Sequence, residues 1–237
     1  MTPSRILITG GAAGIGLAIA REAAAAGHDV VVIDRAAAPV GTSIQADLSD
    51  PASTARALEE ALAGGPITRI VNNVGAVFPH PVEEQTLDEV DAAFALNLRC
   101  AIQCTQALLP GMREARFGRI VNMASRAALG KELRSAYAAT KAGLIGLTRV
   151  WALELGADGI TANAIGPGPI ATELFEKANP PGHPRTQAIV DAVPVRRVGT
   201  PEDVAHAAAF FLDERSGFVT GQTLYVCGGM TVGVAPL

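Results

Sequence analysis

The sequence contains little cysteine and no sign of a disulfide framework. Its 237 residues include 3 cysteines, and an odd number without a secretion signal argues against paired cysteines. Cys100 and Cys104 lie four residues apart with no histidine beside them. A metal site would need more ligands than these. We therefore expect two small buried apolar side chains and no metal.

Long hydrophobic runs and basic runs are also missing. No apolar segment is long enough to span a bilayer, and the opening MTPSRILITGG enters a strand-like run without the pattern of a signal peptide. The net charge is −4 and no stretch is rich in lysine or arginine. These absences exclude nucleic acid and membrane as expected partners and predict a cytoplasmic protein.

The composition that is present is that of an ordinary globular protein. Hydrophobic residues make up 49% of the chain and charged residues 18%. Neither repeats nor a linker interrupt it, so residues 1–237 are expected to form a single α/β domain. A core of that size needs no disulfides.

Short runs rich in valine and isoleucine alternate with longer stretches of helical period. The predicted strands are 5–9, 29–34, 43–47, 68–73, 118–125, 159–165 and 222–226. The predicted helices are 16–26, 51–62, 87–112, 135–155 and 202–212. Continuous apolar strands indicate a sheet covered on both faces. The alternation predicts a Rossmann-type, doubly wound parallel sheet of about seven strands.

One segment interrupts this alternation. Residues 166–187, GPGPIATELFEKANPPGHPRTQ, carry five of the 15 prolines. Long excursions of this kind are often lids or binding loops, and we expect a substrate lid around 173–197.

A glycine-rich turn follows the first predicted strand and opens a helix, in 9-TGGAAGIG-16. Gly10, Gly14 and Gly16 permit tight turns and a close approach of backbone to a ligand. The helix N-terminus behind them offers free N–H groups and a positive dipole end to a pyrophosphate. Glycines also serve plain turns, but the order of strand, turn and helix favours dinucleotide binding.

Asp34 ends the second predicted strand. A carboxylate there accepts hydrogen bonds from an adenosine ribose and repels a 2′-phosphate. Arg35 follows and is able to hold such a phosphate, and the two side chains can also form a surface pair. Because the glycine loop contains alanines and no basic residue, NAD is favoured over NADP.

Tyr137 and Lys141 share one helix face in 137-YAATK-141. A free tyrosine titrates near ~10, and a nearby ammonium lowers that pKa toward the range useful for acid–base catalysis. Ser125 ends the preceding strand, at the sheet edge where ligands bind. The alternatives are a surface pair and a turn serine.

Together these motifs resemble the short-chain dehydrogenase/reductase family, over essentially the whole chain. The matching stretches are TGGAAGIG (9–16), NNVG (72–75), Ser125 with YAATK, PGPIAT (167–172), GTPEDVA (199–205) and GFVTGQ (217–222). The spacing from Ser125 to Tyr137 is one residue shorter than is common in that family. We place the missing residue in the loop 129-LGKELRS-135. Cys227 stands where many members of that family carry an acidic residue.

The resemblance implies roles for individual residues. Tyr137 would be the general acid–base, Lys141 would lower its pKa and bind the nicotinamide ribose, and Ser125 would hold the substrate oxygen. Asn97 would position a water in the proton relay. The residues expected to bind the cofactor are Gly10, Gly14, Ile15, Gly16, Asp34, Arg35, Asp47, Leu48, Asn73, Gly75, Tyr137, Lys141, Pro167, Gly168, Ile170 and Thr172. Asn97 and Thr172 also have plain structural readings, as a polar helix residue and a helix cap.

The main hypothesis is an NAD-dependent oxidoreductase that interconverts a secondary alcohol and a ketone. One alternative is an NADPH-dependent 3-oxoacyl-thioester reductase of the acyl-carrier-protein type, for which Arg113, Arg116 and Arg119 are a weak candidate docking patch. Another is a non-catalytic NAD(P)-binding regulator. The family implies a homotetramer or homodimer formed through the helices at 87–112 and 135–155.

The substrate itself is left open by the sequence. Several charged residues lie in the loops expected around the pocket: His80, Arg126, Lys131, Arg134, His183 and Arg185. Most such residues are solvated, but any that face the cleft favour a polar or acidic substrate. Leu129, Leu174 and Phe175 favour an apolar one.

Overall fold

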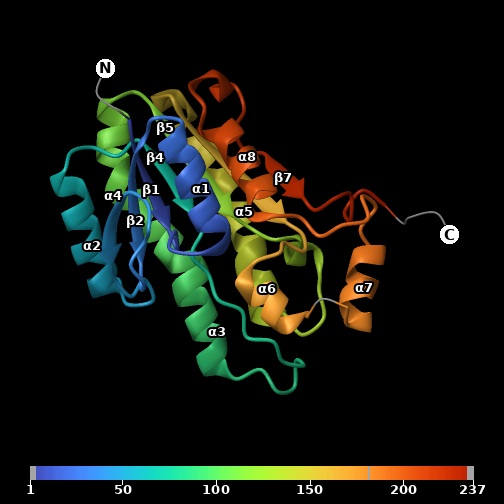
Figure 1. Cartoon of the computed structure of the whole chain (residues 1–237). Helices are drawn as coiled ribbons and strands as arrows, with labels where there is room; N and C mark the ends of the chain where they lie inside the picture. The colour runs from blue at the N-terminus through green and yellow to red at the C-terminus, as the bar shows by residue number, and fades with distance from the viewer. Residues whose placement is uncertain (1–3, 181, 234–237) are drawn as a thin grey trace.

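A computed structural model describes residues 4–180 and 182–233, and its centre is a parallel sheet of seven strands in the order β3-β2-β1-β4-β5-β6-β7 (Figure 1). The strands are β1 (Arg5–Thr9), β2 (Asp29–Asp34), β3 (Thr42–Gln45), β4 (Arg69–Asn72), β5 (Gly118–Met123), β6 (Ile160–Pro167) and β7 (Thr223–Val226). The reversal of strand order between β1 and β4 is that of a doubly wound Rossmann-type sheet, which confirms the predicted fold class.

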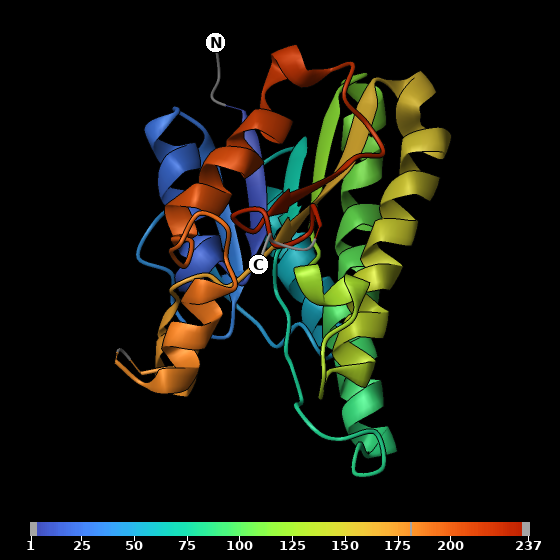
Figure 2. The ribbon, with the colours of Figure 1, turned by 90° about the vertical axis from the view of Figure 1, so that its right-hand side faces the viewer.

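Helices cover both faces because successive strand residues point to opposite sides. In β1, Ile6 and Ile8 join a core with α1 (Gly14–Ala25) and α8 (Pro201–Leu212). Leu7 joins a second core with α2 (Pro51–Ala63) and α4 (Cys100–Glu114). The last residue of α5 (Ser135–Leu155) also packs into this core. Figure 2 shows α1 and α8 on one side of the sheet and α4 and α5 on the other.

The two cysteines of α4 lie inside the second core. Cys100 is 1% exposed and Cys104 is fully buried, so they are the small apolar residues that their spacing predicts. In the described parts of the chain, no cluster of three or more His, Cys, Asp or Glu side chains is placed to hold a metal ion. No helix there combines the length and apolar character needed to cross a membrane.

The helix predicted at 87–112 is interrupted, which corrects the sequence analysis. It consists of α3 (Leu87–Phe94), a π-helical turn η1 (Ala95–Arg99) and then α4. The segment around 173–197 also contains two short helices that were not predicted, α6 (Glu173–Ala178) and α7 (Pro184–Asp191). Thr172 and His183 begin them as side-chain caps.

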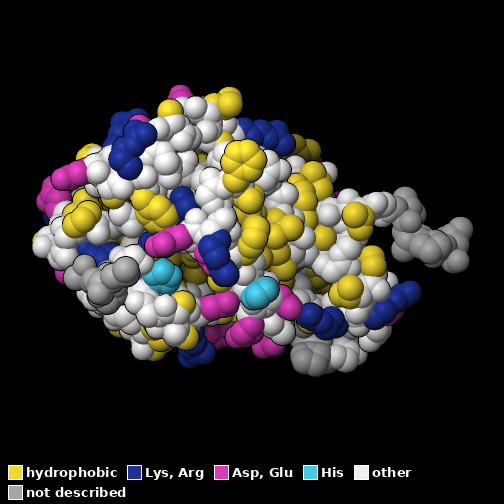
Figure 3. Space-filling view, turned by 90° about the horizontal axis from the view of Figure 1, so that it is seen from above, with side chains coloured by type: hydrophobic (Ala, Val, Ile, Leu, Met, Phe, Trp, Pro, Cys, Tyr) yellow, Lys and Arg dark blue, Asp and Glu magenta, His cyan; other side chains and the backbone are white. Residues whose placement is uncertain are grey.

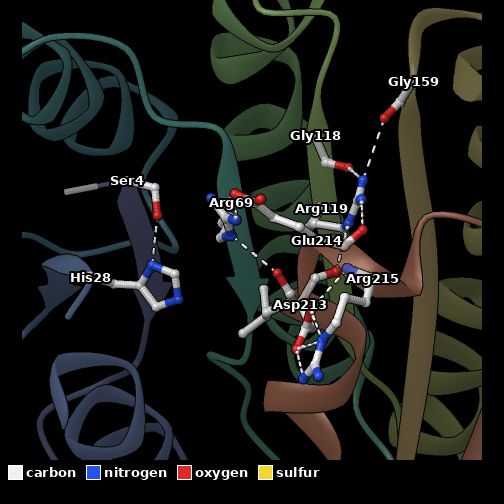
Figure 4. A network of polar contacts seen from close by, with 10 residues as sticks. Ser4, His28, Arg69, Gly118, Arg119, Gly159, Asp213, Glu214 and Arg215 are labelled. Atoms are coloured by element: carbon white, nitrogen blue, oxygen red, sulfur yellow. Dashed lines mark hydrogen bonds and ion pairs between the residues drawn. The ribbon is translucent and has the colours of Figure 1, made fainter. Parts of the chain in front are cut away.

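Two buried arginines hold α8 at the amino-terminal edge of the sheet (Figure 4). Arg69 Nε donates to Leu212 O at 3.0 Å, and Arg119 Nε donates to Asp213 O at 3.2 Å. They therefore satisfy carbonyls at the end of the helix. The Phe117 ring lies 4.6 Å and 4.3 Å from the two guanidinium carbons.

A cavity of about 480 Å³ opens beside this network, between α1 and α8. Its lining includes His28, Arg69 and Glu214, and it contains none of the predicted site residues. Seen from above, acidic, basic and hydrophobic side chains are interspersed over the molecule (Figure 3). The predicted site does not lie near this cavity. It lies at the other edge of the sheet, where the strands have their carboxyl-terminal ends.

Candidate active site

Lys141 reaches from α5 to the carboxyl end of β5. Its Nζ donates to Met123 O at 2.6 Å, and the residue is only 2% exposed. The same Nζ lies 5.7 Å from the centroid of the Tyr137 ring, one turn earlier on the helix. Burial lowers the pKa of Lys141 to about 8, because a dry environment disfavours the charged amine.

Tyr137 departs from the sequence prediction in its acidity. Burial raises the pKa of Tyr137, and the Ser125 side chain and the charge of Arg134 oppose that rise. Burial of the phenol therefore outweighs the lowering that the sequence predicts. The Lys141 amine donates to the Met123 carbonyl.

Asn97 lies in the π turn and is 1% exposed. Its Oδ1 accepts from Ala76 N at 2.7 Å, and its Nδ2 donates to Ala76 O at 2.9 Å and to Thr140 Oγ1 at 3.1 Å. A Cβ on Gly75 would lie 3.0 Å from Asn97 Oδ1 and 3.2 Å from Lys141 Nζ. The π turn, a feature often found at functional sites, thus places Asn97 against the Gly75–Ala76 backbone beside the buried amine.

Asn73 holds the glycine loop in its conformation. The Asn73 Nδ2 donates to Thr9 O at 3.0 Å and to Gly10 O at 2.9 Å. Gly10 and Gly14 have φ of 69° and 54°, which favours glycine. A Cβ on Gly16 would lie 2.1 Å from Gly10 O. Only glycine fits there. No side chain therefore covers the loop backbone, which can face a ligand at the start of α1. Ile15 packs against the first core and helps to anchor this helix start.

Asp34 joins the end of β2 to this loop. Its Oδ2 accepts from Ala12 N at 3.0 Å, and its Oδ1 accepts from Ala36 N at 3.1 Å. A cavity of about 270 Å³ opens beside it. The lining residues are Gly10, Asp34, Arg35, Ala46, Asp47, Leu48, Asn73, Val74, Gly75, Ala76 and Leu96. Residues from four strand ends or loops thus meet in one concave site, as a cofactor site requires.

Asp47 and Leu48 form one wall of that cavity. Asp47 Oδ1 accepts from Ser49 N at 2.9 Å and from Ser49 Oγ at 2.6 Å, and these bonds lower the pKa of Asp47. Leu48 is buried. The Asp47 carboxylate is therefore fixed by its own turn at the edge of the cavity, where the family resemblance implies cofactor binding.

The stretch from Pro167 to Thr172 closes the other side of the loop. Pro167 ends β6, and a Cβ on Gly168 would lie 2.8 Å from Cys227 Cβ, so glycine is needed for this close packing. The Thr172 hydroxyl caps α6 by accepting from Phe175 N at 3.3 Å. A Cβ on Gly14 would meet Thr172 Cγ2 at 3.3 Å, so Thr172 borders the glycine loop as well.

Ile170 lies between Pro167 and Thr172 and is anchored by the motif at 199–205. Ala171 N donates to Gly199 O at 2.8 Å, and Gly199 N donates to Pro169 O at 2.9 Å. A Cβ on Gly199 would lie 2.6 Å from Ile170 Cδ1. The motif therefore fixes the backbone around Ile170.

A buried polar network supports the site, and the sequence did not point to its members Asn122 and Thr148. Asn72 does not face the site: it is buried and donates to Asn122 Oδ1 at 2.8 Å, and Asn122 in turn donates to Thr148 Oγ1 at 2.9 Å. Thr9 Oγ1 accepts from Asn73 N at 3.0 Å. Polar residues within otherwise apolar strands are the only sequence signal for this buried network.

Comparison with known proteins agrees with this geometry. The family described as enoyl-(acyl carrier protein) reductase matches residues 10–231. The BbsD subunit of (2S)-[(R)-hydroxy(phenyl)methyl]succinyl-CoA dehydrogenase from Thauera aromatica is 35% identical, over 95% of this chain and 96% of its own. The 3-oxoacyl-[acyl-carrier-protein] reductase MabA from Mycobacterium avium is 36% identical, over 96% and 90%.

Among solved structures, a blue fluorescent protein from a metagenomic library, in complex with NADPH, superposes with a TM-score of 0.87. It shares 34% identity over 96% of this chain and 98% of its own. Fold, glycine loop and the Tyr137–Lys141 pair define an oxidoreductase that uses a nicotinamide dinucleotide. The chain belongs to the short-chain dehydrogenase/reductase family, whose members interconvert CH–OH and keto groups.

Proposed function

We propose that this protein is an NAD-dependent oxidoreductase that interconverts a secondary alcohol and a ketone, with Tyr137 as general acid–base. The observation that carries the proposal is the buried Lys141 amine, held by Met123 O at 2.6 Å beneath Tyr137. A buried, dehydrated amine costs stability, and acid–base chemistry at the sheet edge is a function that explains it.

The residues present fit a dinucleotide. The loop from Gly10 to Gly16 excludes a Cβ at Gly16 and leads into the N-terminus of α1, an arrangement suited to a pyrophosphate. Gly10, Gly14 and Gly16 would hold that group, and Asp34 and Leu48 would border the adenosine. When bound, the nicotinamide would supply or accept the hydride.

The chain's own residues would handle the proton. In reduction the Tyr137 phenol donates a proton to the ketone oxygen, and in oxidation the tyrosinate takes one from the alcohol. Ser125 Oγ accepts from Ala127 N at 3.1 Å, and the Ser125 side chain also acts on the Tyr137 phenol. When substrate binds, the Ser125 hydroxyl would donate its proton to the substrate oxygen. Lys141, with its pKa lowered to about 8, can exchange a proton near neutral pH.

The choice of NAD rests on Asp34. Its carboxylate lies at the β2 end and in the cavity wall, where it would repel a 2′-phosphate. Arg35 lines the same cavity and is the residue that would accept the phosphate. The relative bound to NADPH supports that second possibility.

The second candidate function is an NADPH-dependent 3-oxoacyl-thioester reductase, which the similarity to MabA favours. The arginine patch proposed for an acyl carrier gives it no support. Arg113 and Arg116 both pair with Asp158, at 3.0 Å and 3.2 Å, and Arg119 is buried. A non-catalytic regulator is disfavoured because a sensor has no use for a buried amine under a tyrosine.

We also propose a homotetramer or homodimer built through the helical segments at 87–112 (α3, η1 and α4) and 135–155 (α5), and a lid around 173–197. On α5, Leu144 and Leu155 are buried, but Leu153 is 87% exposed and Val150 is 47% exposed. Exposed aliphatic residues on a long helix are the apolar surface that a partner subunit would cover.

Initial rates over a panel of secondary alcohols and ketones, with NAD(H) and with NADP(H), test the proposed function. The panel spans sugars, hydroxy acids, steroids, aromatic alcohols and 3-oxoacyl thioesters. Turnover of one class with NAD supports the proposal. Turnover of thioesters with NADPH alone supports the second candidate. Tight cofactor binding without any turnover supports the regulator.

A further inference from the structure

The cavity of about 480 Å³ between α1 and α8 takes no part in the candidate active site. It lies at the amino-terminal edge of the sheet, away from the strand ends that border the glycine loop. Both helices turn small or aliphatic side chains to it, and alanine fills little of the space between them. The apolar part of the lining consists of Ile19, Ala23, Ala26, Ala205, Ala209 and Leu212.

Arg69 forms part of the polar lining of this cavity and is only 2% exposed. Its Nε donates to Leu212 O at 3.0 Å, and its Nη2 donates to Glu214 Oε1 at 3.2 Å. In residues 4–180 and 182–233, Arg69 Nη1 has no hydrogen-bond partner. The Glu214 side chain is 77% exposed, so the pair extends from the buried guanidinium toward solvent. One nitrogen of a buried cation is thus left for a ligand.

Positive charge exceeds negative charge in the buried part of this network. Arg119 is also buried, and its guanidinium donates to Gly118 O at 2.8 Å and to Glu214 O at 3.1 Å. The Phe117 ring lies within 4.6 Å of the guanidinium carbons of both Arg69 and Arg119. Among the described residues, Glu214 is the only carboxylate that forms an ion pair with either arginine. Two buried cations therefore share one carboxylate, and an anion would compensate the second charge.

His28 adds a second hydrogen-bonding group to the cavity lining. It directly precedes β2, while Arg69 begins β4, and β1 lies between these two strands. The Nδ1 of His28 lies 2.6 Å from Ser4 Oγ (Figure 4). Burial and the charge of Arg69 lower the pKa of His28, which favours the neutral ring at neutral pH. When Ser4 donates to Nδ1, that neutral ring carries its proton on Nε2 and can donate it to a ligand.

The carboxylates of the lining limit the charge of a ligand. Asp213 is already paired with Arg215 at 2.6 Å. Glu22, on α1, and Glu214 also line the cavity, and both would repel a group that carries two negative charges. A single carboxylate meets less repulsion than a phosphate and still compensates the guanidinium.

We propose that the cavity between α1 and α8 is a second ligand site, which binds a small carboxylic acid with an apolar body. The carboxylate would accept from Arg69 Nη1 and His28 Nε2. The apolar body would lie along the alanines of the two helices, where each buried methylene favours binding. The site is separate from the reaction at the carboxyl-terminal edge and does not depend on the cofactor or substrate used there.

Calorimetric titration of the cofactor-saturated protein with hexanoate, its neutral amide hexanamide and inorganic phosphate tests this site. We expect hexanoate to bind at least about tenfold more tightly than the other two probes, the value of one charge-assisted contact. His28→Ala removes a donor, and Ala209→Leu fills the cavity from α8. Each should weaken hexanoate binding about tenfold. Both variants leave Arg69 in place, because its loss would also free the end of α8.

Ala24→Leu is the matched control for the cavity-filling variant. It makes the same change on α1 at an exposed residue outside the cavity lining and should leave hexanoate binding unchanged. Loss of affinity in both His28→Ala and Ala209→Leu supports the site. Absence of hexanoate binding, equal or tighter binding of hexanamide or phosphate, or binding that either variant leaves unchanged would overturn the inference. Hexanoate held at the active site would give this last result.

Discussion

The buried amine of Lys141 donates to the backbone carbonyl of Met123 across 2.6 Å and thereby joins the first half of α5 to the carboxyl end of β5. This contact places the amine beside Asn97 and Gly75, one helical turn after Tyr137. It also places a titratable group where water is scarce, which gives the site a measurable dependence on pH.

Stability should rise with pH because of Lys141. Its folded pKa of about 8 lies below the ordinary value of 10.5, so the unfolded chain binds more protons between these values. The cost of burying the charge is then present below pH ~8 and relieved above it. Relative to Lys141→Met, the wild-type free energy of unfolding should increase by about 2 kcal/mol between pH ~7 and ~9.5. Urea denaturation at several pH values checks this, and a constant difference would contradict it.

Arg134 should tune the acidity of the catalytic tyrosine. Its positive charge lowers the pKa of Tyr137 against the effect of burial. In Arg134→Gln, the pH at which alcohol oxidation reaches half of its maximal kcat should therefore move upward. The profile of kcat at saturating substrate measures this shift. Arg215→Gln removes an exposed charge that is already paired with Asp213 and should leave the profile in place. An unchanged profile in Arg134→Gln would show that Arg134 does not tune Tyr137.

Asp34 should select the cofactor. Asp34→Asn keeps an oxygen that can accept from Ala12 N but removes the negative charge, and Arg35 stays in the cavity wall. The ratio of kcat/KM for NADP to that for NAD should rise at least about tenfold, since a like-charge repulsion is worth more than ~1.4 kcal/mol at contact. A ratio that stays constant would show that Asp34 is not the selector.

Gly16 should tolerate no side chain. The added methyl of Gly16→Ala would overlap Gly10 O at 2.1 Å, so the loop must move, at a cost of about 1–3 kcal/mol in folding free energy and with loss of dinucleotide affinity. Thermal unfolding and fluorescence titration with NADH measure the two effects. Gly156→Ala, where a Cβ would meet nothing within 4 Å, is the control and should leave both nearly unchanged.

Much of the fold could be predicted from the sequence because its signals are local. β1 and β2 are continuous apolar runs ended by Thr9 and Asp34, and their ends agree with the structure. The interruption of the helix at 87–112 could not be predicted, since it depends on the tertiary contacts of Asn97 with Ala76 and Thr140. The helices α6 and α7 were missed because prolines and glycines dominate the segment between them.

The candidate site could likewise be predicted only in part. Part of the predicted cofactor set lines the 270 Å³ cavity, because the strand ends of a parallel sheet meet at one edge: Gly10, Asp34, Arg35, Asp47, Leu48, Asn73 and Gly75. Acidity could not be predicted, since the pKa values of Tyr137 and Lys141 depend on burial, which spacing along a helix does not report. The support of the glycine loop by Asn73 likewise depends on a contact between residues distant in sequence.

The central claim is that Tyr137 moves the proton. The most direct test is to compare kcat and cofactor affinity in Tyr137→Phe and in the wild type, using the best substrate of the panel. The variant keeps the ring and loses only the hydroxyl, so kcat should fall by at least about a thousandfold, within the range of general acid–base catalysis. The dissociation constant for the cofactor should change less than about threefold. Turnover that survives in Tyr137→Phe would contradict the mechanism.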